Sequence, residues 1–126
     1  MPLILGTNSI KDTGYEVANS LRFNSGSSDN LSRTPSSASN KKTFTISFWL
    51  KTSVATGDYT LFYAAGSGSH EFKIGFDSSE RIYIYDFDGS AFNMLLKTNR
   101  VFRDISSWYH IVFAIDTTNS TEDDRI

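Results

Sequence analysis

Three aromatic side chains alternate along one short segment, and their types and spacing suit binding chemistry. Tyr83, Tyr85 and Phe87 occupy every second position. In a strand they share one face, while Ile82 and Ile84 point to the other. Leaving both faces of such a strand in water is costly. Three uses are open: a platform on which sugar rings stack, an interface with another chain, or packing in the core.

Carboxylate and amide side chains lie at the two predicted turns, one before and one after this row. Asp86, Asp88 and Asn93 surround the Asp88-Gly89 pair, and Asp77 opens the preceding loop. Hard oxygen ligands at loop tips suit Ca²⁺, so the four residues form a candidate calcium site. The alternative, which we favour, is that these aspartates cap the backbone of their own turns. No other cofactor is indicated.

The two histidines are the remaining candidates for acid–base chemistry. His110 lies between Tyr109 and Ile111 in an apolar run and has no acidic neighbour in sequence. We interpret it as a structural histidine whose ring bonds to a neighbouring strand or loop, rather than as a ligand or general base. His70 follows a Gly/Ser turn, where a solvated side chain is expected. The absence of cysteine excludes a thiolate zinc site and a cysteine nucleophile. We therefore expect no catalytic residues and no enzyme.

Composition points to strands as the elements that position these side chains. The chain has 126 residues, enough for one domain, and a formal net charge of −2. A net charge this close to zero does not indicate a protein that binds nucleic acid. No segment reaches the ~20 apolar residues of a membrane span, and no signal peptide is visible. Serine and threonine supply 31 of 126 residues and aromatic residues supply 14%, a composition typical of strands and turns.

Alternating hydrophobicity at 8–12-residue spacing predicts an all-β fold, an antiparallel two-sheet sandwich. Residues 77–80 form a four-residue hairpin loop, and Asp88-Gly89 favours a tight turn. Residues 108–116 are apolar at nearly every position, which indicates a strand in the centre of a sheet. The strands are predicted at residues 20–24, 30–33, 43–51, 59–65, 70–76, 81–87, 90–97 and 108–116, with the first step of another at 125–126.

Two of these segments carry a family resemblance. Phe-Thr-Ile-Ser-Phe-Trp in 43–51 and Trp-Tyr-His in 108–116 resemble landmarks of the laminin-G-like, concanavalin A-like lectin/glucanase superfamily. The order and spacing match across roughly residues 19–116. The resemblance implies a jelly roll that continues with several closing strands. We therefore expect residues 19–126 to be the N-terminal part of such a domain, incomplete at its C-terminus, and residues 1–18 to be a leader or anchoring segment.

A second resemblance concerns the biological setting. Residues 20–29 and 33–37 are similar to jelly-roll modules in structural and fibre proteins of marine bacteriophages. This implies a non-catalytic structural or adhesion module of a virion, made in the host cytoplasm. Its expected partners are other virion proteins or copies of itself.

Two alternatives to a structural module follow from the superfamily. One is a lectin-like module that binds host surface glycans. The other, less favoured, is a glycoside hydrolase. The glucanase branch of the superfamily carries a Glu-x-Asp-x-x-Glu strand, and this sequence has no such strand.

Overall fold

The computed structural model describes residues 19–53, 57–121 and 124–126. The chain divides into two compact parts, residues 1–38 and 39–126, which we describe separately. The predicted leader, residues 1–18, lies outside the described residues. No described helix is long and apolar enough to cross a membrane.

Residues 19–38 contain a single helical turn, the 3₁₀ helix Ser25–Ser27, and no strand. The strands predicted at 20–24 and 30–33 are therefore wrong. The Asn24 backbone N–H donates to Asp29 Oδ2 at 2.9 Å, and the Gly26 N–H donates to Asn24 Oδ1 at 3.1 Å. Alternation gives a segment two faces, but a strand also needs a backbone partner. Here the short polar side chains fold the backbone into a local turn instead.

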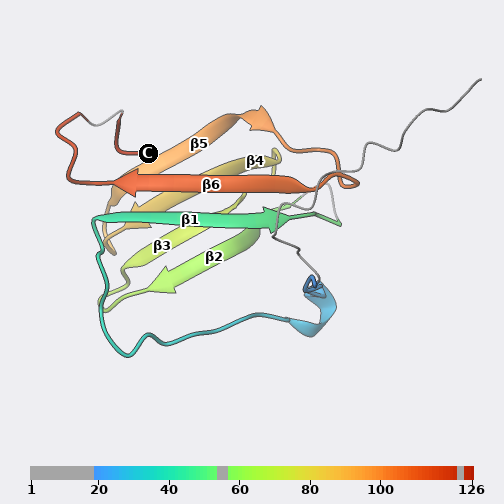
Figure 1. The fold of residues 1–126 in the computed structure, drawn as a ribbon, viewed down its shortest axis with the longest axis horizontal. Coiled ribbons are helices and arrows are strands. Elements are labelled where there is room, and N and C mark those ends of the chain that lie inside the picture. Colours follow the sequence, from blue (N-terminus) through green and yellow to red (C-terminus); the bar gives the residue numbers. More distant parts are fainter. Residues whose placement is uncertain (1–18, 54–56, 122–123) are drawn as a thin grey trace, which may run out of the picture. The chain divides into compact units, whose positions relative to one another are not determined.

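Residues 39–126 form two antiparallel sheets, which confirms the predicted all-β sandwich. One sheet has two strands in the order β1-β6, and the other has four in the order β2-β3-β4-β5. Figure 1 shows β1 and β6 lying across the four-stranded sheet. The strands are β1 (Thr43–Leu50), β2 (Tyr59–Ala65), β3 (Glu71–Phe76), β4 (Arg81–Phe87), β5 (Phe92–Val101) and β6 (Tyr109–Asp116).

Short hairpins connect the strands of the larger sheet. The β3–β4 loop is the predicted four-residue loop, closed by a hydrogen bond from the Asp77 N–H to the Arg81 carbonyl at 2.9 Å. The β4–β5 loop is longer than predicted, because the Asp88 N–H donates to the Ala91 carbonyl and β5 begins only at Phe92. That strand then runs to Val101, through residues expected to form a loop.

The smaller sheet corrects the prediction that 108–116 is a central strand. Among the described residues, β6 pairs only with β1. Its inward residues are Ile111, Phe113 and Ile115, whereas His110 and Val112 are exposed. Apolar composition on both faces therefore does not require a strand on both sides. Residues 125–126 form no strand, although the Asp116 N–H donates to the Arg125 carbonyl at 2.8 Å.

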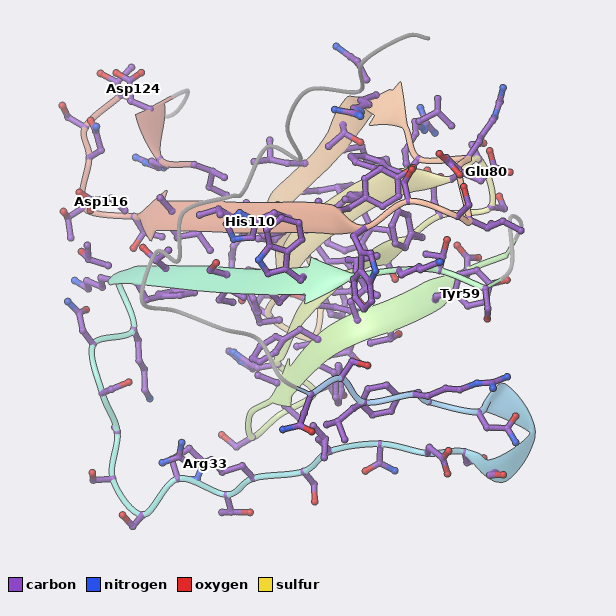
Figure 2. The ribbon with its side chains drawn as sticks, turned by 45° about the vertical axis from the view of Figure 1, so that its right-hand side comes forward. Arg33, Tyr59, Glu80, His110, Asp116 and Asp124 are labelled. Carbon is purple, nitrogen blue, oxygen red and sulfur yellow. The ribbon has the colours of Figure 1, made fainter. Side chains whose placement is uncertain are left out.

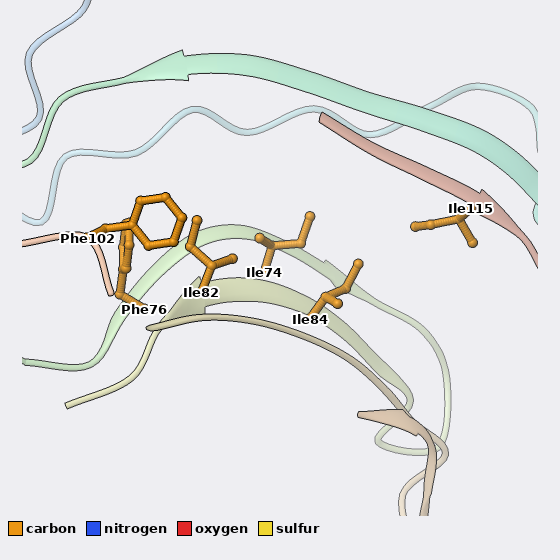
Figure 3. Close-up of a cluster of buried hydrophobic side chains, with 6 residues drawn as sticks. All are labelled: Ile74, Phe76, Ile82, Ile84, Phe102 and Ile115. Carbon is orange, nitrogen blue, oxygen red and sulfur yellow. The ribbon is translucent and has the colours of Figure 1, made fainter. Parts of the chain in front are cut away.

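The core lies between the two sheets. Figure 3 shows its six buried side chains: Ile74, Phe76, Ile82, Ile84, Phe102 and Ile115. In the same view, β3 and β4 arch toward β1 and β6, so the concave side of the larger sheet is turned away from the core. We call this concave side the outer face.

Candidate functional site

The aromatic row predicted from the sequence lies on the outer face. Ile82 and Ile84 of β4 are each 2% exposed and belong to the core. The side chains between and after them, Tyr83, Tyr85 and Phe87, point to the opposite side and are half-buried. The core is thus filled from the isoleucine face of β4, and the aromatic face of the strand is left for another use.

The rings of the row join a larger cluster through Phe92 on β5. The Tyr83 and Tyr85 rings are stacked, with centroids 5.8 Å apart and planes at 11°. The Phe92 ring lies 5.3 Å from that of Tyr85 and 5.1 Å from that of Phe87. Phe92 is also one of the more exposed rings of the chain, at 54%. We define the aromatic face as Tyr63, Tyr83, Tyr85, Phe87, Phe92 and Leu95, all on the outer face.

An ion pair from β3 lies within the aromatic face. Lys73 Nζ is 5.4 Å from the ring centroids of both Tyr63 and Tyr85, within the range of cation–π attraction. Tyr85 Oη donates to Glu71 Oε2 at 2.9 Å, and Lys73 Nζ is 3.9 Å from the same oxygen. The interaction with Tyr85 is the main cause that raises the pKa of Lys73, so the amine keeps its charge. These contacts tie rings from β2 and β4 together across β3.

Sequence reasoning found the row on β4 but missed its partners on the neighbouring strands. Lys73 lies opposite Tyr85, and Glu71 lies opposite Phe87. Counting outward from the predicted four-residue loop at 77–80 would instead place Lys73 opposite Ile84, one residue away from the observed register. The observed pairing starts from Asp77 and Arg81, which close the hairpin, so the predicted loop alone could not have revealed Glu71 and Lys73. Phe92 was harder to place, because a register shift follows Asp86.

The four candidate calcium ligands do not form one group. Asp77 begins the β3–β4 loop, whereas Asp86, Asp88 and Asn93 lie at the other end of β4 and its hairpin. Asn93 Nδ2 donates to Asp86 Oδ2 at 3.0 Å. Asp88 Oδ1 accepts the N–H groups of Ser90 and Ala91, and the Ala91 bond is the main cause that lowers the Asp88 pKa. Asp88 thus caps its own turn, the alternative favoured from the sequence.

Asp77 caps the opposite hairpin and holds two cations. Its Oδ1 accepts the backbone N–H groups of Ser79 and Arg81, and its Oδ2 lies 3.0 Å from Arg81 Nη2 and 3.4 Å from Lys97 Nζ. The backbone N–H of Arg81 is the main cause that lowers the Asp77 pKa to about 2. In the described part of the chain, no three His, Cys, Asp or Glu residues are grouped so that they could hold a metal ion.

His110 lies on the smaller sheet, where Figure 2 labels it on β6. Its ring stacks on Trp49 of β1, with centroids 4.7 Å apart and planes at 10°. His110 Nε2 is 2.9 Å from Ser47 Oγ, which fixes the ring. The predicted bond to a neighbouring strand is thus present, and the side chain is exposed. His70 is exposed before β3, as expected.

The fold and this face define an all-β sandwich with an aromatic surface on the side of the larger sheet that is turned away from the core. The family model described as "Concanavalin A-like lectin/glucanases superfamily", of laminin G type, matches residues 24–122. The chain belongs to this superfamily. Such a domain fits a non-catalytic or carbohydrate-binding module. Searches of curated proteins and of solved structures returned no match.

Proposed function

We propose that this chain is a non-catalytic adhesion module that binds carbohydrate through the aromatic face. The observation that carries the proposal is the continuous contact of rings from Tyr83 through Tyr85 and Phe92 to Phe87 on the side away from the core. Aromatic rings present broad apolar surfaces at low conformational cost. The apolar C–H faces of sugar rings can cover them while the sugar hydroxyls stay in water.

The placement of the cluster also supports an extended ligand. The rings span two adjacent strands, β4 and β5, and Tyr63 adds a third from β2. The side of the larger sheet away from the core is concave (Figure 3), and strand pairing and burial place the rings on that side. A row of rings on a concave surface can contact several sugar units at once, which suits an oligosaccharide better than a single sugar.

The carboxylate nearest the rings favours binding over hydrolysis. Retaining and inverting glycosidases need two carboxyl groups about 5–10 Å apart, on either side of the scissile bond. Glu71 instead accepts the Tyr85 hydroxyl at 2.9 Å and faces the Lys73 ammonium at 3.9 Å. This carboxylate holds side chains in place. We therefore expect no sugar release when the protein is incubated with oligosaccharides that it retains.

The proposed setting is a virion, in which the module would serve a fibre or surface protein and meet host glycans. The support is the resemblance of residues 20–29 and 33–37 to modules of bacteriophage structural proteins. Mass spectrometry of purified particles tests this part independently of ligand binding. Tryptic peptides of this chain in the particle would support it, and their absence from every purified particle fraction would contradict it.

A glycan array followed by calorimetry tests the binding function. The variant Phe92→Ala removes a ring that is 54% exposed, so the loss of packing within the protein is small. Trp108→Ala is the matched control, because Trp108 is also 54% exposed but lies beside β6, on the smaller sheet. Losing one ring contact of about 0.5–1.5 kcal/mol should weaken the retained glycan roughly two- to tenfold.

The control separates the aromatic face from general surface effects. We expect Trp108→Ala to bind like the parent protein and Phe92→Ala to bind more weakly, both with unchanged circular dichroism. Equal binding by all three proteins would place the glycan elsewhere. A folded parent protein that retains no glycan on the array would contradict the carbohydrate-binding function.

A second candidate function is assembly with other virion chains or with copies of this chain. The observation that favours it is the apolar outer side of the smaller sheet, where Trp49, Trp108 and Val112 are all more than half exposed. A groove of about 390 Å³ between β5 and β6 adjoins Val112 and His110. Light scattering after size-exclusion chromatography tests self-assembly. Oligomers that dissociate in Val112→Asp but persist in Phe92→Ala would support it.

A further inference from the structure

We propose that the glycan bound by the aromatic face is uncharged, and that Lys73 positions the rings instead of binding an acidic sugar. This inference rests on the carbohydrate-binding function proposed above and specifies its ligand class. It follows from how the charged side chains of the outer face are already engaged.

Lys73 is committed to contacts inside the protein. Its ammonium lies 5.4 Å from two ring centroids, those of Tyr63 and Tyr85, which come from strands on either side of β3. Its side chain is only 25% exposed. A cation in this place attracts both rings at once and limits their movement. An anionic sugar would have to compete with the rings and with Glu71 for the ammonium.

Glu71 completes this arrangement from the same strand. It lies 3.9 Å from Lys73 Nζ and accepts the hydroxyl groups of Tyr85 at 2.9 Å and Tyr63 at 3.5 Å. The carboxylate balances the lysine charge. It also bonds to the hydroxyls of Tyr85 and Tyr63, so these two hydroxyls are already engaged within the protein.

The other cations of the outer face are paired as well. On the four strands of this sheet, the remaining outward basic residues are Arg81 and Lys97. Both contact Asp77, at 3.0 Å and 3.4 Å. Because both cations share the carboxylate of Asp77, an acidic glycan would have to compete with that carboxylate for either of them. An uncharged glycan faces no such competition.

The first experiment compares neutral and acidic ligands. The probes are cello-, manno- and galacto-oligosaccharides on one side and oligogalacturonate and alginate oligomers on the other, titrated calorimetrically into the full chain. We expect binding to neutral probes only, changing less than about twofold between about 0.1 M and 1 M NaCl, a range over which the screening length falls from about 10 Å to 3 Å.

The outcomes distinguish this inference from the function on which it rests. Preference for the uronate probes, with affinity lost at high salt, would overturn the inference and leave carbohydrate binding intact. A folded protein that binds neither panel would contradict the proposed function itself. Binding to neutral probes that is insensitive to salt supports both.

The second experiment tests the positioning role of Lys73. Lys73→Met should weaken binding of the neutral probe, because Tyr63 and Tyr85 lose the cation between them, and Lys73→Arg should restore it, because a guanidinium also attracts ring faces. Lys97→Met is the matched control and should bind like the parent protein. Unchanged binding by Lys73→Met would contradict the positioning role. Failure of Lys73→Arg to restore binding in a folded protein would also contradict it.

Discussion

The ring of Tyr83 lies directly over Gly75, its cross-strand partner on β3. A Cβ atom at position 75 would come within 2.6 Å of Tyr83 Oη and within 2.3 Å of the Tyr59 carbonyl oxygen. Neither distance is compatible with a side chain. The absence of a Cβ atom at this position therefore lets a tyrosine lie against the middle of the outer face.

Gly75→Ala should disturb both stability and the aromatic face. The Tyr59 oxygen belongs to the backbone of β2, so the strand itself must shift, at about 1–3 kcal/mol for overpacking of this kind. We expect a lower urea midpoint and weaker glycan retention. Gly26→Ala is the control, since its added Cβ would meet only Asn24 Oδ1 at an ordinary 3.5 Å. A Gly75→Ala protein as stable as the parent would show that β2 and β3 are less closely packed than described.

Ile74→Ala should be among the most destabilising substitutions in the sandwich. Ile74 is 0% exposed and lies at the centre of the core between the two sheets. Its truncation removes buried methyl groups and leaves a cavity, at about 2–5 kcal/mol. Ile105→Ala, at a residue 43% exposed, is the matched control and should cost far less. Chemical denaturation of the two variants measures the difference, and equal losses would contradict the description of the core.

Stability should fall in acid as the capping aspartates become protonated. Backbone N–H groups and Arg81 hold the pKa of Asp77 at about 2, below its ordinary value of 3.8. Asp104, bound mainly by the Ser106 hydroxyl, also has a pKa of about 2. A pKa lowered by folding stabilises the native state above the unfolded pKa, and this stabilisation is lost as the pH falls through the folded value. We therefore expect a constant urea midpoint above about pH 5 and a steep loss between about pH 4 and 2.

The variant Asp77→Asn assigns part of that acid loss to one residue. It should be less stable than the parent protein at neutral pH and show a shallower decline in acid. Asp58→Asn, at an exposed carboxylate before β2, is the control and should follow the parent curve. Identical acid profiles for the parent protein and Asp77→Asn would contradict this assignment.

Calcium should have little effect on stability. Asp88 Oδ1 accepts hydrogen bonds from its own loop at 2.8–3.0 Å, and Asp86 accepts one from Asn93. A metal ion would have to replace these bonds. An ion present at one hundred times its Kd would add about 2.7 kcal/mol, a shift of several degrees in Tm. We expect equal Tm values in calcium and in EDTA. A rise of several degrees that Asp88→Ala abolishes would instead establish the calcium site.

The alternation of apolar residues was sufficient to predict the strands of the sandwich and the side of β4 that carries the aromatic row. It failed at 20–24 and 30–33, where polar side chains bond locally. It also misjudged β6, because a run that is apolar on both faces can be an edge strand when one face, with Val112, stays exposed.

The candidate site was harder to predict from the sequence than the fold, for a related reason. Lys73 and Tyr85 are twelve residues apart, and only the register of the hairpin brings them together. Alternation reports which face a residue occupies on its own strand. It does not report which residue lies opposite on the next strand.

The exposure of the tryptophans has a consequence for spectroscopy. Both tryptophans of the chain lie at the smaller sheet and are more than half exposed, Trp49 at 59% and Trp108 at 54%. Indoles that are wetted in the native state should change their emission wavelength little when the chain unfolds. Intrinsic fluorescence would then be a poor monitor of denaturation but a sensitive one for any molecule that covers the smaller sheet. An emission shift to the blue on mixing with a partner would report docking there, whereas glycan on the outer face of the larger sheet would leave the spectrum unchanged.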